Sequence, residues 1–211
     1  MALSDSKSAD RGRGGAAIRN GGDRRNGVEA TQMNRCLQCG TAMIVHIENY
    51  KDSLLGVPAL LLGIEIYRCP NCGEYEIVIP CHSGLLRFIA HKLLEKPSRF
   101  AGNEIAYLRK YLDMTADELA KQIGVKRGTI SRWERNSERI GIVADRLLRM
   151  LVYCAKPNAG FPAEKFSRIS SRVGNPLKFV LRFNGTEWET VEQVNGKNTK
   201  RYFNPSHALA S

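Results

Sequence analysis

Two short cysteine motifs of the same form constrain this chain more than any other feature. They are CLQCG at residues 36–40 and CPNCG at residues 69–73, and 29 residues separate the second cysteine of the first motif from the first cysteine of the second. In each motif a glycine follows the second thiol, which favours a tight turn whose last residue needs a positive φ. Two such turns that face each other would bring four sulfur atoms together.

Four thiolates on two turns are the usual ligand set of a structural zinc site, with Zn–S distances of about 2.3 Å. The sequence therefore predicts one structural Zn²⁺ per chain, with the ligands Cys36, Cys39, Cys69 and Cys72. A hydrolytic zinc needs an open coordination position for water and a general base, and four thiolates leave no such position. We therefore expect no enzymatic activity. A zinc hydrolase or a thiol oxidoreductase is the rival interpretation.

Disulfides and redox-active CxxC motifs are the alternatives to zinc. Disulfides need an oxidising compartment, but the N-terminal stretch MALSDSKSADRGRGG lacks the apolar segment of a secretory signal. A redox CxxC motif normally occurs once, at the start of a helix in a βαβ unit, and neither motif fits that pattern. Cys81 and His82 are weaker candidate ligands, because four better-spaced thiols already fill the site. Cys154 is expected to be a buried helix residue without a role.

Composition places the cysteine motifs in an acidic module that follows a basic tail. Residues 1–33 contain few apolar side chains and are predicted to be disordered, because they cannot bury enough surface to offset chain entropy. In residues 34–82 the stretches TAMIVHIENY, GIEIYRC and YEIVIP predict short strands. The net charge is +11 for the whole chain but −3 for residues 36–82, so a polyanion should bind elsewhere. The longest apolar run, residues 54–64, is too short to cross a bilayer, which predicts a soluble cytoplasmic protein.

Helical patterns dominate the next segment, residues 83–156. The stretch GLLRFIAHKLLEKP has apolar residues at helical spacing and predicts a helix that Pro97 stops. This helix could be a linker, the first helix of the next domain or part of a dimer seam. Further along, Thr115 and Glu118 are spaced as a capping box and Gly124 is placed to end that helix. A short turn leads to another helix that starts near Lys126, and this order is a helix-turn-helix arrangement.

The stretch KRGTISRWERN predicts a helix with a basic outer face, because burial of Ile130 and Trp133 would turn its basic side chains outward. An arginine fork can read guanine in the major groove, and basic residues at either end can neutralise phosphates. Residues 83–155 carry a net charge of +6, which suits double-stranded DNA. The predicted DNA-binding residues are Lys126, Arg127, Gly128, Thr129, Arg132 and Arg135. An amphipathic bundle with a solvated basic face, or an adaptor that binds protein, is the alternative.

The order of the two CxxCG motifs, GVKRGTISRWERN and ADRLLRMLV resembles YgiT/MqsA-type zinc-finger and helix-turn-helix regulators of bacteria. The second part is similar to the Xre/Cro class, and the resemblance covers about residues 34–153. It implies a homodimer that represses transcription at a palindromic operator. It also implies base reading by Arg127, Gly128 and Arg132 and phosphate contacts by Lys126 and Arg135. Ala116 replaces a common glutamine of the class, and Lys126 replaces its usual Ser or Thr cap.

Some relatives are antitoxins whose zinc module binds a ribonuclease toxin. This chain has a basic extension at residues 157–211, in which KFVLRFNGTEWETV predicts a β-hairpin with a type I′ turn at Asn184 and Gly185. Because such antitoxins are generally shorter, we expect a transcriptional regulator. The alternative is an antitoxin of a type II toxin–antitoxin system that autoregulates its operon. A toxin or another protein would then bind the zinc module.

The expected fold class is α+β. A small zinc-bound β module is followed by an all-α helix-turn-helix domain of the Xre/Cro type and by a C-terminal β-hairpin tail. The predicted segments are a tail at 1–33, a zinc module at 34–82, a DNA-binding domain at 83–156 and an extension at 157–211.

Overall fold

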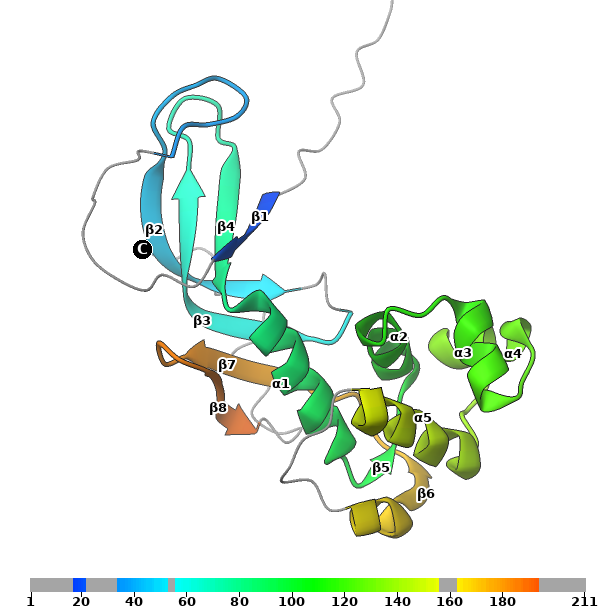
Figure 1. The fold of residues 1–211 in the computed structure, drawn as a ribbon. Helices are drawn as coiled ribbons and strands as arrows, with labels where there is room; N and C mark the ends of the chain where they lie inside the picture. The colour runs from blue at the N-terminus through cyan, green and yellow to red at the C-terminus, as the bar shows by residue number, and fades with distance from the viewer. Residues whose placement is uncertain (1–16, 22–33, 53–55, 156–162, 194–211) are drawn as a thin grey trace, which may run out of the picture. The chain divides into compact units, whose positions relative to one another are not determined.

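The computed structural model divides into two compact units (Figure 1). The first comprises the described residues up to Glu48 together with Ile64–Ile79, and the second comprises Asn49–Gly63 and the described residues from Pro80 onward. The described residues are 17–21, 34–52, 56–155 and 163–193. The segment boundaries predicted from the sequence stay a prediction. Of the predicted tail at 1–33, only Ala17–Gly21, which form strand β1, lie among the described residues.

The sheet of the first unit is built from β1, from parts of β2 (Ile44–Asp52) and β3 (Ala59–Arg68), and from β4 (Tyr75–Pro80). In this unit β3 pairs antiparallel with β4, and Ile66 lies opposite Ile77. Apolar residues that alternate with polar ones place every second side chain in the core, and both of these isoleucines are buried. The strands predicted from the alternating stretches are therefore confirmed.

The second unit contains the other part of β3, which pairs with a C-terminal hairpin. Strand β7 (Phe179–Phe183) runs parallel to Ala59–Leu62, and β8 (Trp188–Gln193) pairs antiparallel with β7. Ala59, Leu60 and Leu61 are consecutive and all buried, as expected for a strand covered on both faces. The predicted hairpin is confirmed, but it is part of a sheet and not a tail.

The type I′ turn predicted for this hairpin is wrong. A type I′ turn needs a positive φ at both central residues, and only Gly185 has one, at 102°. The connection is instead four residues long, since Phe183 pairs with Trp188. The Asn184 side chain explains the difference, because its Oδ1 accepts hydrogen bonds from the backbone N–H groups of Thr186 and Glu187 at 3.0 and 2.9 Å.

Helix α1 (His82–Leu94) ends at Leu94, just before Pro97, as the sequence predicts. Its apolar face is buried, including Leu85, Ile89 and Leu93. The helix packs on α2 (Gly102–Tyr111), and the Tyr107 hydroxyl donates a hydrogen bond to the Leu86 carbonyl at 2.7 Å. Of the three roles that the sequence allows, α1 therefore serves as the first helix of a helical layer.

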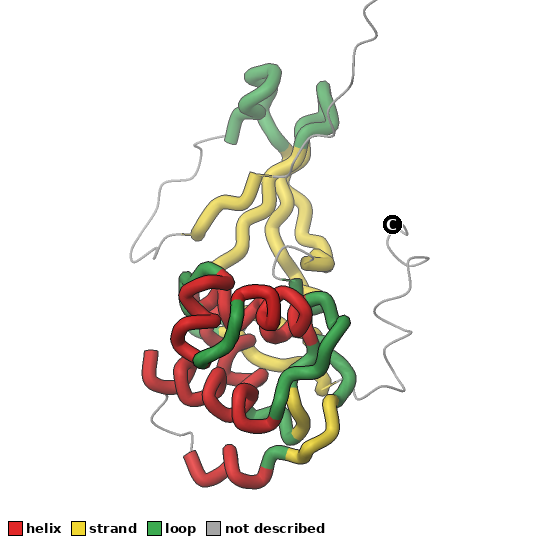
Figure 2. Tube along the Cα trace, turned by 90° about the vertical axis from the view of Figure 1, so that its right-hand side faces the viewer, coloured by secondary structure: helices red, strands yellow, loops and turns green. Residues whose placement is uncertain are grey.

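Three more helices complete this layer, in which the five α-helices of the described residues lie together (Figure 2). They are α3 (Ala116–Ile123), α4 (Arg127–Glu134) and α5 (Ile142–Ala155). A 3₁₀ helix, η1 (Ala163–Arg168), leads to β6 (Ser170–Val173), which pairs parallel with β5 (Ser98–Arg99). Among the described residues, no helix has the length and apolar character needed to cross a membrane.

A buried arginine joins α5 to the end of α1. Arg149 Nε donates to Asp145 Oδ1 at 2.7 Å, and its Nη atoms donate to backbone carbonyls that include those of Leu94 at 2.7 Å and Ser98 at 2.9 Å. The guanidinium also lies 4.0 Å from the ring centroid of Phe100. A buried charge needs such compensation, and here it also satisfies carbonyls at the C-terminus of α1 that have no partner within the helix.

A second buried ion pair forms between Lys96, after α1, and Glu104 of α2, and the same glutamate also contacts the segment before β7. Glu104 Oε2 accepts hydrogen bonds from Lys96 Nζ at 2.6 Å and from the Ala101 backbone N–H at 2.7 Å. Its other oxygen accepts a hydrogen bond from the Leu177 backbone N–H at 2.8 Å. Removal of either charged partner would leave the other buried and unpaired. Because Arg149 and Glu104 also bond to the distant backbone groups of Leu94 and Leu177, the helical layer depends on residues far apart in the chain.

Candidate nucleic-acid interface and metal centre

The four predicted zinc ligands lie together in the first unit. Their sulfur atoms are all within 4.8 Å of one another, and the pairs Cys36–Cys72 and Cys39–Cys69 are each 3.4 Å apart. A tetrahedral Zn²⁺ with Zn–S distances of about 2.3 Å holds its sulfur atoms about 3.8 Å apart, so this cluster has the size that the ion needs. The four cysteines can therefore bind a metal ion, and their chemistry is consistent with zinc.

Two similar turns bring the cysteines together. In the first turn the Gly40 backbone N–H donates to the Cys36 carbonyl at 2.8 Å, and in the second the Gly73 N–H donates to the Cys69 carbonyl at 3.1 Å. Gly40 has a φ of 72° and Gly73 a φ of 75°, the left-handed conformation that the sequence predicts for both. The repeated motif therefore produces a repeated local geometry.

The thiols of the cluster differ in acidity. Hydrogen bonds with the side chain and backbone of Thr41 lower the pKa of Cys39 to about 6. At Cys72 a backbone hydrogen bond at Glu74 lowers the pKa, but hydrogen bonds with the other three thiols, together with burial, raise it to about 12. Four thiolates this close repel one another unless a cation lies between them, so a divalent metal ion suits the cluster.

The other cysteines lie outside the cluster. Among the residues described, the group of side chains that could hold a metal ion includes neither Cys81 nor His82. Cys81 instead precedes α1 in a left-handed conformation with a φ of 44°. Cys154 lies on α5 and is exposed, so the prediction of a buried residue is wrong. The last turn of α5 directs this thiol away from the core that Val152 enters.

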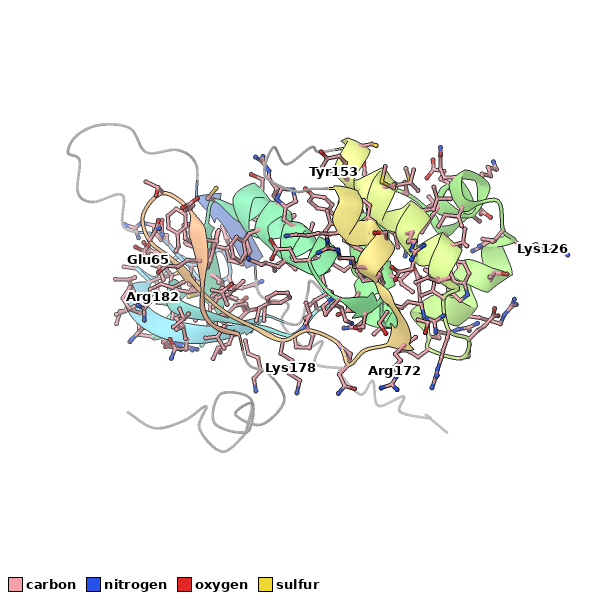
Figure 3. All side chains as sticks on the ribbon, turned by 90° about the horizontal axis from the view of Figure 1, so that it is seen from below. Glu65, Lys126, Tyr153, Arg172, Lys178 and Arg182 are labelled. Carbon is pink, nitrogen blue, oxygen red and sulfur yellow. The ribbon has the colours of Figure 1, made fainter. Side chains whose placement is uncertain are left out.

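Helices α3 and α4 form a helix-turn-helix geometry within the second unit. The Thr115 hydroxyl accepts a hydrogen bond from the Glu118 N–H at 3.2 Å, and Glu118 Oε2 accepts one from the Thr115 N–H at 2.7 Å, which confirms the capping box. Gly124 ends α3 with a φ of 79°. Lys126 precedes α4 at the turn, and its side chain points away from the ribbon (Figure 3).

The side chains of α4 divide into a buried and an exposed face. Ile130 and Trp133 are buried at 0% and 5% exposure, as predicted. The exposed face contains Lys126, Arg127, Gly128, Arg132 and Arg135, and Thr129 is half-buried beside it. The structure thus brings together the six residues predicted to bind DNA, whereas their contacts with DNA stay a prediction.

Packing against α2 fixes the orientation of α4. Arg109 Nε donates to Glu134 Oε1 at 2.6 Å, and its Nη1 donates to the Met114 carbonyl at 2.9 Å. The Gly102 backbone N–H donates to Asn136 Oδ1 at 2.7 Å. Asn136 follows α4 with a φ of 58°, a left-handed conformation that asparagine adopts more readily than most residues. These contacts tie both ends of α2 to the C-terminal end of α4.

The exposed arginines have different partners. Arg127 Nε lies 3.7 Å from Asp117 Oδ2, and both side chains are largely exposed. Arg135 Nε donates to the Ser131 carbonyl in its own helix at 3.1 Å. Arg132 Nε donates to Glu138 Oε2 at 2.6 Å, and this hydrogen bond lowers the pKa of Glu138. Each arginine keeps further N–H donors that can contact a ligand.

Residues 105–142 match a family model described as helix-turn-helix. This part of the chain is a helix-turn-helix domain. The matched range holds most of α2, all of α3 and α4, and the start of α5. The match supports a DNA-binding transcription regulator of the Xre-like type, whereas the finer resemblance to YgiT/MqsA-type regulators stays a prediction. Neither a curated protein nor a solved structure matched the chain.

Sequence reasoning missed two residues that shape this site. Glu138 contacts Arg132 across the turn after α4, and Gly102 allows the start of α2 to approach the Glu134 carbonyl. The spacing of six positions between Arg132 and Glu138 predicts a contact only if the chain turns back at Asn136 in a left-handed conformation. The closeness of α2 to α4 has no local signal in the sequence.

Proposed function

We propose that the chain is a sequence-specific transcriptional repressor that binds double-stranded DNA through α4. The observation that carries this proposal is the helix-turn-helix match over a segment that exposes three arginines on one face, Arg127 and Arg132 of α4 and Arg135 directly after it. In the proposal Arg127 and Arg132 read base edges, and Lys126 and Arg135 contact phosphates. Gly128 and Thr129 lie between them and face the groove.

A second copy of the chain would bind the other half of a palindromic operator, with the two α4 helices in major grooves about 34 Å apart. An apolar stripe on α5 supports a homodimer. Val143 and Met150 are 76% and 37% exposed, and Leu147 and Leu151 are half-buried beside them. These positions recur at the spacing of one helix face, which is where a partner helix would pack.

The metal has a structural role in this proposal. A Zn²⁺ held by four thiolates would fix the two turns of the first unit, and four protein ligands leave no position for water or substrate. The proposed activity is therefore binding without catalysis. The first unit would serve as the surface for a protein partner, while the net charge of −3 on residues 36–82, which include the four clustered cysteines, makes that stretch a poor site for nucleic acid. The antitoxin interpretation and its toxin partner stay predictions.

The test of this proposal compares two double variants with the wild type. Arg127→Ala with Arg132→Ala removes both proposed base readers. Lys178→Ala with Arg182→Ala removes the same charge from side chains that lie apart from Lys126 (Figure 3). Binding to DNA from upstream of the chain's own gene should lose its sequence selectivity only in the first variant. Equal selectivity in both variants would assign DNA reading to another surface.

A further inference from the structure

Two side chains of the second unit hold the guanidinium of Arg132 in place. Its Nε donates to Glu138 Oε2 at 2.6 Å, and its Nη2 donates to Thr129 Oγ1 at 3.0 Å. The arginine and the glutamate side chains are 49% and 45% exposed, so the pair lies at the surface where a ligand can reach it. These two hydrogen bonds orient Arg132 on the face that the helix-turn-helix presents.

The turn after α4 is built to bring Glu138 to this position. Asn136 adopts a left-handed φ of 58°, which reverses the chain direction. The Ser137 and Glu138 backbone N–H groups then both donate to the Arg132 carbonyl, at 3.0 and 3.3 Å. The Ser137 hydroxyl donates to the same carbonyl at 3.1 Å. Glu138 is therefore anchored by backbone and side chain to the residue that it contacts.

The contacts of Arg132 leave one edge of its guanidinium available. An arginine has five N–H donors, and the two hydrogen bonds described here use one at Nε and one at Nη2. A bidentate contact with guanine O6 and N7 needs two parallel donors, and Nη1 and Nη2 can still supply them. A Cβ atom at Gly128 would lie 3.6 Å from Arg132 Nη1, so the glycine leaves space beside this edge.

Of the three exposed arginines on α4 and directly after it, Arg132 is the one whose Nε donates a hydrogen bond to a carboxylate. Arg127 Nε approaches Asp117 only to 3.7 Å, beyond hydrogen-bond distance, and Arg135 Nε is bonded to a carbonyl of its own helix. A carboxylate also repels phosphate, so Glu138 weakens sequence-independent attraction to DNA. Glu138 therefore lowers the affinity for DNA of any sequence but orients Arg132, a side chain that reads a base. This combination favours selectivity over affinity.

We propose that Glu138 is a positioning residue that determines specificity, because it holds Arg132 by Nε so that the outer edge of the guanidinium reads one guanine. This inference rests on the proposed DNA-binding function. It predicts that Arg132 and Glu138 control discrimination at the same base pair. It also predicts that loss of the Glu138 charge does not weaken binding to unrelated DNA.

The test begins with a DNA site that the wild-type full chain selects from a pool of random duplexes. Binding of Glu138→Gln is then measured on that site and on all its single base-pair variants. Asp117→Asn is the matched control, since it removes one exposed acid beside the other arginine of the same helix. Arg132→Lys and the double variant Arg132→Lys with Glu138→Gln complete the set.

We expect Glu138→Gln to lower discrimination about tenfold at one G·C base pair of each half-site and to leave the other positions unchanged. Arg132→Lys should lose discrimination at the same base pair, and the double variant should lose no more than Arg132→Lys alone. Asp117→Asn should change the affinity for every duplex by a common factor. Circular dichroism should show the same helix content for all variants.

Three results would overturn the inference. Glu138→Gln could shift all duplexes by one factor, as the control does, which would make Glu138 a simple charge. Glu138→Gln could instead lower discrimination at a different base pair from the one that Arg132→Lys affects. Finally, the losses of discrimination caused by the two single substitutions could add fully in the double variant. If the wild type selects no sequence from the pool, the proposed function itself fails, and this outcome is separate from the other results.

Discussion

Two glycines show how single residues decide the geometry of the helix-turn-helix. Gly102 starts α2 where a Cβ atom would lie 2.4 Å from the Glu134 carbonyl oxygen, a backbone atom that cannot move freely. Gly128 lies in α4 and its Cβ position meets only Arg132 Nη1, at 3.6 Å. The first glycine is needed for the fold, whereas the second leaves space at the surface.

The same substitution should therefore have opposite effects at the two positions. Gly102→Ala should lower the free energy of unfolding by about 1–3 kcal/mol, because the methyl group forces α2 and α4 apart. Gly128→Ala should raise it by about 0.5–1 kcal/mol, because alanine loses less chain entropy in a helix. Urea unfolding followed by helical circular dichroism measures both values. Changes of the same sign at both positions would contradict the assignment.

The roles of residues that depend on near neighbours in the sequence were predictable, whereas the roles of residues that depend on distant partners were not. The capping box of Thr115 and the end of α3 at Gly124 depend on neighbours within a few positions, and the sequence predicts both. Glu138 and Gly102 depend on how the chain returns to α4. The roles of Arg149 and Glu104 depend on carbonyl and amide groups from other segments, which no spacing rule reveals.

At the scale of elements, α5 has two different faces. One face enters the core through Leu148 and Val152, which are fully buried, and through the ion pair of Asp145 and Arg149. The opposite face exposes Val143 and Met150. Large apolar side chains on a helix surface are costly in water when several lie together, so this face supports the proposed dimer.

A charge placed on this face should separate the dimer. We expect Val143→Asp to be monomeric at micromolar concentration, because a carboxylate buried between two helices would have no partner. Val191→Asp on β8 is the matched control, since Val191 is also an exposed valine, at 39%, and this variant should stay dimeric. Sedimentation velocity distinguishes the two. A monomeric wild type would remove the dimer from the account.

The types of the elements were largely predictable, but their pairing was not. Alternating apolar residues predict β3 and β4, and helical spacing predicts α1 and α4. The parallel pairing of β7 with β3 joins residues more than a hundred positions apart, so no local pattern reveals it. The predicted type of the hairpin turn was wrong for a local reason. The Asn184 side chain accepts backbone hydrogen bonds, and Asn184 does not adopt a positive φ.

At the scale of the whole molecule, the chain separates two kinds of chemistry between its two units. The four clustered thiols, which could hold a metal ion, belong to the first unit, which contains an acidic stretch, and the arginines of α4 belong to the second. The charge difference between the segments was visible in the sequence. The division within β2 was not, because that strand is a continuous run of residues, whereas in β3 the division falls directly after Gly63, a strand-interior glycine with a φ of 68°.

Metal content tests the assignment of the four ligands. The purified wild type should contain about one zinc ion per chain, because two CxxC turns supply the complete ligand set. Cys39→Ser should lose the ion, and Cys154→Ser should retain it as the matched control, since both thiols are exposed but only one belongs to the cluster. Elemental analysis gives the ratio. Equal zinc content in both variants would contradict the Cys₄ site.

Sequence-selective DNA binding is the central claim, and a salt series on the wild type tests it most directly. The intact chain is titrated onto the duplex from upstream of its own gene and onto a scrambled duplex of equal composition. We predict that affinity for both falls as salt rises from about 50 to 200 mM, since released counterions drive phosphate binding. The native duplex should stay at least about a thousandfold tighter throughout. Equal affinity for the two duplexes at every salt concentration would contradict the account.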